Sequence, residues 1–286
     1  MKALFLINAR SGARRNPALE QIIRDSAFAH EIVGCGSKEE LDGILADAEA
    51  SGFDVAYAVG GDGTVHEIAK RLVGRQLALG VLPTGSGNGF ARHLHLPLDA
   101  TLSLAACADG EIVTIDTAEV NGTPYVGVMG IGFDAVIAHR FAEAGTRGLQ
   151  TYVREGLKAF TTLKAEDYEV DGRKMRAAVI AIANSSQYGN DARVAPLASL
   201  RDGLLDIVIV DDITMMRAPF LLQRLFAGTF HRAAGVSTRQ SAAVTIRRAA
   251  AGAAHLDGEP VMLDAELRVR IVPQSLRVLV PRGVSV

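Results

Sequence analysis

Short apolar runs alternate with helix-like patterns over the first part of the chain. Almost every position is apolar at residues 3–7, 55–59 and 77–82, which predicts three buried strands. From Val65 onward, apolar side chains recur at i, i+3, i+4, i+7 and i+8, the spacing of one helix face. Helices are therefore expected at residues 39–50, 65–73 and 89–96. Because strands and helices take turns, the pattern predicts a parallel sheet covered by helices.

From about residue 116 the pattern changes to strands that are joined by tight turns. Asn121-Gly122 and Asp171-Gly172 each separate two apolar runs, and such pairs favour two-residue turns with positive φ. The expected strands are 113–120, 125–129, 168–170, 175–183, 204–210, 243–248, 255–263 and 267–272. We predict an α/β domain at 1–115 and a mainly antiparallel β-sandwich domain at 116–275. A last strand at 276–280 could lie in either domain, so residues 276–286 could return to the first.

Two helices interrupt the second domain's strands. The first is expected from an apolar stripe made of Leu149, Tyr152, Val153, Leu157 and Phe160. The second, at residues 220–226, is almost wholly apolar, with Arg217, Arg224 and Arg232 around it. We favour burial of this second helix in the core, and contact with a membrane surface is the alternative.

The bulk composition excludes several classes of protein. A formal net charge of −2 over 286 residues gives no basic footprint for nucleic acid. No apolar run reaches the roughly 18 residues of a membrane span, and the apolar start is too short for a secretion signal. Cys35 and Cys107 cannot form a zinc cluster and do not suggest a disulfide framework. We expect a protein of a reduced, cytoplasmic setting.

Two glycine-rich segments carry the strongest chemical signal. Gly60-Gly61-Asp62-Gly63-Thr64 stands between a strand and a helix, where backbone N–H groups and the helix N-terminus can approach a phosphate. Asp62 would repel phosphate unless it serves a metal ion, so we interpret it as an Mg²⁺-linked group. Thr64 as a plain helix N-cap is the simpler alternative. Pro83–Gly89, with three glycines in five residues, also joins a strand to a helix, and ligands collect at such strand ends.

Common nucleotide-binding motifs are absent. The chain has no G-x-x-x-x-G-K-[ST] loop, no G-x-G-x-x-G that opens a helix after a strand, and no protein-kinase set of motifs. Instead, VGGDGTVHEIAKRL followed by LGVLPTGSGNGFARHL resembles the diacylglycerol kinase catalytic domain family, which includes soluble bacterial lipid kinases and sphingosine kinases. NAD kinases and 6-phosphofructokinases share the first element, and the second loop with Asn88 favours the lipid kinases. The resemblance continues through residues 148–160, 184–210 and 255–261, and it implies the NAD kinase/diacylglycerol kinase-like fold.

The resemblance implies an ATP site between the two domains. The matching positions are Asn8, Ala9, Arg10, Ser11, Gly12, Gly60, Gly61, Asp62, Gly63, Thr64, Val65, His66 and Ser86. His66 stands where the family often has Asn, and Ser86 where it often has Thr. The family usually has Asp after the Asn of the second loop, whereas this chain has Gly89 and so lacks that carboxylate.

Catalytic and regulatory residues are implied in the same way. Asp257-Gly258-Glu259 matches the family's DGE element, in which the glutamate is the proposed general base, and Asp62 and Asp257 complete the expected catalytic set. A plain hairpin turn is the alternative for this segment. Ser199, Asp202 and Leu204 match a regulatory Mg²⁺ site of some bacterial members, and a simple turn before a strand is equally compatible.

Taken together, these features predict a kinase that uses ATP and Mg²⁺ to phosphorylate the hydroxyl of diacylglycerol or a related lipid, with a role in phospholipid synthesis. One alternative is a kinase of the same fold that acts on NAD or another soluble metabolite. Another is a catalytically silent protein that binds lipid or nucleotide. The expected partners are ATP and a lipid at the membrane surface, without nucleic acid, and a homodimer is compatible with the sequence. No motif specifies which lipid is the acceptor.

Overall fold

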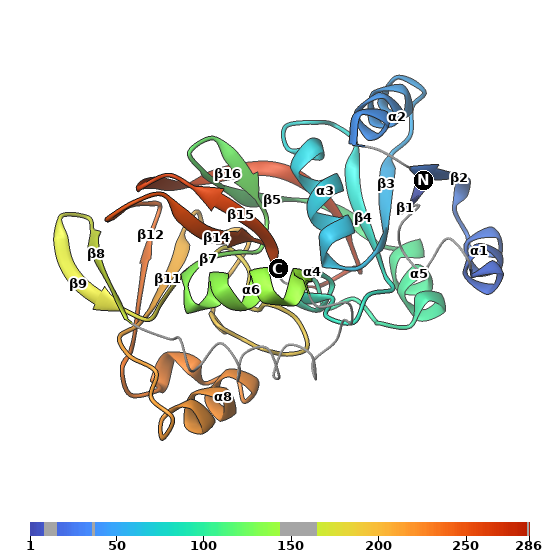
Figure 1. Ribbon diagram of the computed structural model, residues 1–286. Helices are drawn as coiled ribbons and strands as arrows, with labels where there is room; N and C mark the ends of the chain where they lie inside the picture. The colour runs from blue at the N-terminus through green and yellow to red at the C-terminus, as the bar shows by residue number, and fades with distance from the viewer. Residues whose placement is uncertain (9–15, 36–37, 144–164, 285) are drawn as a thin grey trace. The chain divides into compact units, whose positions relative to one another are not determined.

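In the computed structural model, which describes residues 1–8, 16–35, 38–143, 165–284 and 286, the chain divides into two units. The first comprises Met1–Ile115 and Gln274–Val286, and the second comprises Asp116–Pro273 (Figure 1). The predicted strand at 276–280 is the end of the long strand β16 (Glu266–Val280), and its residues belong to the first unit. The N-terminal unit is thus completed by the last residues of the chain.

A parallel sheet with the strand order β2-β1-β3-β4 forms the centre of the first unit. Its strands are β1 (Lys2–Asn8), β2 (Ala29–Cys35), β3 (Val55–Gly60) and β4 (Ala78–Pro83). β16 extends this sheet, because Val278 pairs with Leu79 in parallel. Every residue of β3 and β4 is buried, which explains why these strands are continuous apolar runs in the sequence.

Helices follow the strands of this unit as the alternating pattern predicted. They are α1 (Pro17–Arg24), α2 (Lys38–Ala50), α3 (Asp62–Leu72), α4 (Gly89–His93) and α5 (Ala100–Ala108). The predictions of α2, α3 and α4 are confirmed, although α3 begins three residues earlier than its apolar face suggests. α1, α5 and β2 were missed. The N-caps of α1 and α5 could have been predicted from the sequence, because Asn and Asp are typical N-cap residues. Asn16 accepts a hydrogen bond from the Leu19 N–H at 3.3 Å, and Asp99 accepts one from the Leu102 N–H at 2.9 Å.

A six-stranded antiparallel sheet forms one layer of the second unit, in the order β12-β11-β10-β7-β14-β15. Its strands are β7 (Val128–Gly132), β10 (Val179–Ala183), β11 (Leu205–Val210), β12 (Val236–Ser241), β14 (Gly252–Leu256) and β15 (Glu259–Leu263). The other layer contains β5 (Glu111–Val120), β6 (Thr123–Tyr125), β8 (Glu166–Val170), β9 (Arg173–Ala177), β13 (Ala243–Arg248) and the start of β16.

The sandwich core lies between these two layers. Ile180 and Ile182 of β10 pack in one apolar cluster with Val244 and Ile246 of β13. The alternate residues of β10 belong to a different cluster, which includes Leu221 of α8 (Ala218–Phe226). This period of two follows from the pleat of a strand, and both faces of β10 are buried. The prediction of an α/β domain followed by an antiparallel β domain is therefore confirmed.

Three predicted strands are each two strands in the structure. The run 125–129 is divided between β6 and β7, and the run 175–183 is divided between β9 and β10, with the two parts in different layers. The run 255–263 is the hairpin of β14 and β15. No turn motif marks the break in the first two runs, whereas Asp257-Gly258 marks the hairpin in the third.

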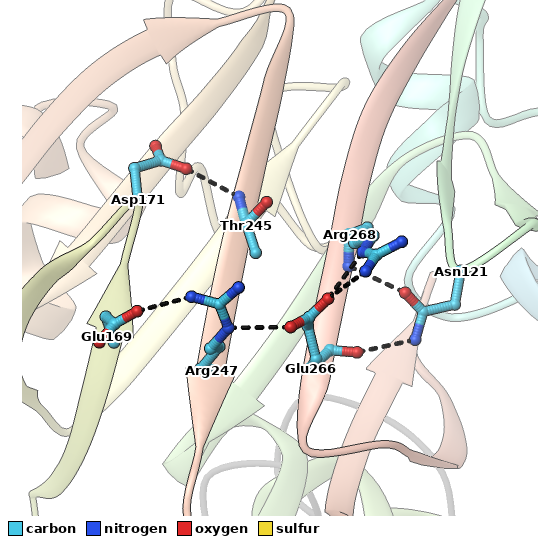
Figure 2. Close-up of polar contacts among 7 residues, drawn as sticks. All are labelled: Asn121, Glu169, Asp171, Thr245, Arg247, Glu266 and Arg268. Carbon is cyan, nitrogen blue, oxygen red and sulfur yellow. Dashed lines mark hydrogen bonds and ion pairs between the residues drawn. The ribbon is translucent and has the colours of Figure 1, made fainter.

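Both asparagine- or aspartate-glycine turns that the sequence predicted are confirmed. Asn121 and Gly122 have φ of 49° and 83°, and Asp171 and Gly172 have φ of 48° and 79°. Figure 2 shows the polar network beside these turns, which runs across neighbouring strands. Its bonds connect Glu169 to Arg247 (2.8 Å), Arg247 to Glu266 (2.8 Å) and Glu266 to Arg268 (2.7 Å), while Asn121 joins it through the Arg268 N–H (2.8 Å).

α8 is only partly a core helix, so the favoured interpretation of residues 220–226 was wrong for most of its surface. Leu221 is buried, whereas Phe220 is 70% exposed and Leu222 is 41% exposed. Met215 and Met216, just before the helix, are 74% and 84% exposed. Among the described residues, no helix is long and apolar enough to cross a membrane. The other predicted apolar stripe, at 149–160, lies outside the described residues.

Candidate functional site

The two glycine-rich loops of the first unit lie against each other. β3 and β4 are parallel neighbours with Gly60 opposite Pro83, so both loops leave the same edge of the sheet. The Thr84 N–H donates to the Gly60 carbonyl at 3.0 Å. A Cβ placed on Gly85 would lie 2.4 Å from the Cα of Gly61. The backbones can approach this closely only because both positions are glycine.

Asp62 connects the two loops. It is the first residue of α3, and its Oδ1 accepts a hydrogen bond from the Gly89 N–H at 2.7 Å. The position where the related family usually has a second carboxylate therefore supplies a backbone donor to Asp62. The N-terminal end of α3 lies at this edge, and the dipole of a helix makes that end a favourable place for an anion.

The other predicted nucleotide-site residues of these loops fall into two groups. Gly63, Thr64 and Val65 lie in the first turn of α3, with the buried His66 next to them, and Ser86 is exposed on the second loop. Gly61 is the N-cap of α3, so the alternative role of Thr64 as an N-cap is wrong. The Thr64 side chain instead covers Gly60, because a Cβ there would lie 2.4 Å from the Thr64 Oγ1.

Asn8 is the last residue of β1, which lies beside β3, so its backbone reaches the same strand-end edge as the glycine loops. Ala9, Arg10, Ser11 and Gly12 lie outside the described residues.

Asn88 shapes the second loop from within. It adopts a left-handed conformation (φ 51°), its Oδ1 accepts from the Gly85 N–H at 3.1 Å, and its Nδ2 donates to the Gly85 carbonyl at 2.7 Å. The loop is further held by Arg92, whose Nε donates to the Gly87 carbonyl at 3.1 Å. Burial, with a smaller contribution from His95, lowers the pKa of His93 to about 4, so this imidazole is neutral near pH 7.

The Asp257-Gly258-Glu259 segment of the second unit is a hairpin turn between β14 and β15. Asp257 and Gly258 have φ of 53° and 84°, which confirms the turn geometry. Unlike an ordinary turn residue, Asp257 directs its carboxylate to three consecutive backbone N–H groups, those of Val126 (3.0 Å), Gly127 (2.7 Å) and Val128 (3.0 Å). These N–H groups lie where the chain passes from β6 to β7, and the carboxylate satisfies them in place of a strand partner.

Glu259 is the exposed first residue of β15. Its carboxylate has no hydrogen bond or ion pair within the part of the chain that the structure describes. An exposed carboxylate on a fixed turn can accept a proton from a bound molecule. Of the two carboxylates in this segment, Asp257 is the one engaged in holding the turn.

The segment with Ser199, Asp202 and Leu204 forms a turn before β11. Asp202 Oδ1 accepts from the Leu204 N–H at 3.0 Å, and the Ser199 Oγ accepts from the Arg201 N–H at 3.3 Å. Burial raises the pKa of Asp206, a hydrogen bond from Gln240 opposes this rise, and the charge of Asp202 adds to it. The described residues contain no cluster of three or more His, Cys, Asp or Glu that could hold a metal ion.

Sequence reasoning missed several buried polar residues near these segments. Asp116, which is 3% exposed, accepts from the Gly203 N–H at 2.8 Å and so supports the Asp202 turn. Asp134, Tyr188 and His255 lie together beside the Asp257 turn. The available signal was weak: a lone aspartate after a glycine-containing strand and a lone histidine in a strand are seldom informative without a structure.

Comparisons with known proteins agree with this arrangement. Residues 2–120 match the family model described as "Diacylglycerol kinase catalytic domain", and residues 127–280 match the "YegS C-terminal NAD kinase beta sandwich-like domain". A Citrobacter koseri protein named "Probable lipid kinase YegS-like" is 30% identical over 294 residues, covering 98% of this chain and 96% of its own length. A Salmonella arizonae protein named "Probable lipid kinase YegS" is 29% identical with the same coverage.

Two solved structures are similar in fold. A diacylglycerol kinase from Bacillus anthracis has a TM-score of 0.70 at 16% identity, covering 99% of this chain and 98% of its own. An NAD kinase from Archaeoglobus fulgidus in complex with ATP has a TM-score of 0.54 at 13% identity, covering 99% of this chain and 94% of its own. At these identities the likeness concerns the fold, which both kinds of kinase share.

Proposed function

Because the chain belongs to the lipid kinase family with a diacylglycerol kinase catalytic domain and a YegS C-terminal domain, we propose that it transfers the γ-phosphate of ATP to the hydroxyl of a lipid. Diacylglycerol or a similar lipid alcohol is the proposed acceptor. The observation that carries the proposal is the Asp257-Gly258-Glu259 turn, which presents an exposed carboxylate on a backbone that is held in place.

The nucleotide is assigned to the first unit, at the two glycine-rich loops. Both loops leave the same edge of the sheet with their glycine backbones against each other, and the N-terminal end of α3 at this edge favours negative charge. The proposed contacts are those of the matching positions from Asn8 to Gly12, from Gly60 to His66, and at Ser86. Asp62, already fixed by the Gly89 N–H, is the carboxylate of this set that can face a cation.

A magnesium ion fits this donor set. Mg²⁺ is commonly held by one or two carboxylates together with substrate phosphates, so the oxygen ligand of Asp62 is sufficient on the protein side. When bound, the ion would neutralise charge on the transferred phosphoryl group. Asp62 would hold that ion, and the loop N–H groups would orient the phosphates.

The acceptor and the general base are assigned to the second unit. Glu259 would take the proton from the lipid hydroxyl as the phosphoryl group moves, and Asp257 would keep the turn in position. The exposed apolar side chains of Phe220 on α8, and of Met215 and Met216 just before it, support access to lipid at a membrane surface.

A second cation site at Asp202 is also proposed, as a support for activity that does not join the chemistry. The charge of Asp202 adds to the rise in the pKa of Asp206 that burial causes, and a cation beside the two carboxylates would offset that repulsion. Asp202→Ala should raise the Mg²⁺ concentration that gives half-maximal rate. An unchanged Mg²⁺ dependence would leave this segment as a plain turn.

The test of the function is transfer of label from γ-labelled ATP to dispersed diacylglycerol, with the parent protein and with Asp62→Asn. We expect transfer by the parent and none by Asp62→Asn, with the fold intact. Asp42→Asn is a suitable control, because it removes an exposed carboxylate of α2 that pairs with Arg71 of α3, the helix that begins with Asp62. A near-parent rate for Asp62→Asn would refute the role of this carboxylate.

A further inference from the structure

A buried chain of hydrogen bonds leads to the Asp257-Gly258-Glu259 turn. His255 of β14 is 2% exposed, and its Nε2 lies 2.9 Å from the Oδ2 of Asp134, which is 6% exposed in the first turn of α6 (Phe133–Glu143). The Tyr188 hydroxyl donates to the same oxygen at 2.6 Å. On the other side of the imidazole, the Gly258 N–H donates to the His255 Nδ1 at 3.3 Å.

These contacts define the protonation of the ring. Since a backbone N–H is always a donor, the Nδ1 that receives it carries no proton. The single proton of the neutral imidazole is then on Nε2, where it points at the Asp134 carboxylate. The Asp134 oxygen accepts from two donors, one on the ring and one on Tyr188. Each end of the imidazole therefore selects the same tautomer.

The absence of a side chain at Gly130 makes room for the bond between Asp134 and His255. His255 lies opposite Gly130 in the pairing of β14 with β7. A Cβ on Gly130 would lie 2.2 Å from the Asp134 Oδ2 and 2.3 Å from the His255 Nε2. No other residue could occupy position 130 without displacing the Asp134–His255 bond.

The chain of bonds acts on the backbone next to Glu259. The Glu259 side chain has no hydrogen bond or ion pair among the described residues, so its position depends on the turn that carries it. Asp257 holds one side of that turn through the N–H groups of residues 126–128. His255 holds the other side through Gly258.

We propose that His255, oriented by Asp134 and Tyr188, is a positioning residue that fixes the Gly258 backbone and thereby the carboxylate of Glu259. The effect on catalysis rests on the proposed function, in which Glu259 is the general base. The effect on the turn itself does not depend on that function. The two can therefore succeed or fail separately.

The first measurement is the ¹⁵N spectrum of the His255 ring in the full-length parent protein at neutral pH. We expect a bare Nδ1 and a protonated Nε2. A proton on Nδ1, alone or together with one on Nε2, would overturn the proposal whatever the activity is.

The second measurement compares His255→Gln, which can keep a donor near Asp134 but loses the acceptor for Gly258, with the parent. We expect faster amide exchange at Gly258, kcat lower by about 10- to 100-fold, and an unchanged KM for ATP, because misplacement of a catalytic group by about 1 Å has this effect. Tyr188→Phe, a milder change at a half-buried site, should shift the same quantities in the same direction by a smaller factor.

His139→Gln is the matched control. His139 lies on α6 like Asp134, and its Nε2 is 3.3 Å from the Ala254 carbonyl of β14, but the ring has no bond to the turn. Its kcat and Gly258 exchange should equal those of the parent. Parent-like kcat and exchange in a folded His255→Gln would refute the positioning role. If the parent transfers no phosphate while the tautomer and exchange results hold, the proposed function fails and the structural part stands.

Discussion

The turns at Asp171-Gly172 and Asp257-Gly258 have nearly the same backbone and different surroundings. In each, an aspartate with φ near 50° precedes a glycine with φ near 80°, and each connects two antiparallel strands. Asp171 is exposed, and its carboxylate accepts from the Thr245 N–H at 2.8 Å on a neighbouring strand (Figure 2). Asp257 instead points inward, to three consecutive N–H groups and beside a buried histidine.

The difference shows that a turn motif specifies its backbone but not its role. The local sequence is sufficient for the positive φ values, since glycine and aspartate tolerate them. Whether the aspartate accepts from a neighbouring strand or from backbone N–H groups inside the domain depends on residues far away in the sequence. At 257–259 the hairpin is confirmed, and a functional role of the anchored segment stays a prediction.

The largest expected difference between the two turns concerns the residue after each glycine. Glu259→Gln keeps the side-chain size and removes the basic oxygen, so kcat should fall by about 10²–10⁴-fold. ATP affinity should stay the same. Arg173→Gln, at the equivalent place after Gly172, should leave kcat unchanged. Steady-state kinetics with lipid and a direct ATP titration would check both, and equal rates for Glu259→Gln and the parent would show that the base lies elsewhere.

A smaller difference is expected for the aspartates themselves. Asp257→Asn places an amide group where three N–H donors need acceptors, and hydrogen bonds to a charged group contribute about 1.5–3 kcal/mol each. Urea unfolding should show a loss of about 2–4 kcal/mol. Asp171→Asn retains an acceptor for Thr245 and loses a surface ion pair with Arg239, so about 1 kcal/mol or less is expected. Equal losses would mean that the inward anchor adds nothing.

The smallest effect is expected from the exposed network beside the Asp171 turn. Hydrogen bonds from Arg247 and Arg268 hold the pKa of Glu266 below its ordinary value of 4.5. Its contribution to stability is therefore present above about pH 4.5 and is lost as the pH falls through the lower, folded-state pKa. Glu266→Gln should remove this small acid dependence in thermal unfolding scans, and 1 M salt should weaken it in the parent. If Glu266→Gln caused a large change in the melting temperature at acid pH, the view that solvent screens this network would be contradicted.

The fold was predictable where one physical signal dominated. Buried parallel strands such as β3 and β4 are continuous apolar runs, and the asparagine- and aspartate-glycine turns have a direct conformational cause. The division of the run 125–129 between β6 and β7 was not predictable, because Val126 and Gly127 find their partner in Asp257, about 130 positions away. The exposed face of α8 was missed for a related reason: composition shows that a helix is apolar, not which elements cover it.

The candidate site, like the fold, contains parts that the sequence could predict and parts that it could not. The glycine loops were recognisable, because close backbone approach requires glycine. Asp62 was recognisable because a carboxylate among phosphate-binding N–H groups would repel phosphate unless it serves a metal ion. That the Asp62 carboxylate bonds to Gly89, and that Asp134, Tyr188 and His255 meet beside the turn, depends on tertiary contacts that no spacing records.

The most direct test of the central claim is one reaction in which the parent protein, γ-labelled ATP and Mg²⁺ meet two acceptors together, dispersed diacylglycerol and NAD. The label is then measured separately in the organic and aqueous phases. We predict that labelled phosphate accumulates in the lipid and that NAD stays unlabelled. Label in NAD with none in lipid would contradict the account and assign the chain to a soluble acceptor, and label in neither, with ATP bound, would indicate a silent binding protein.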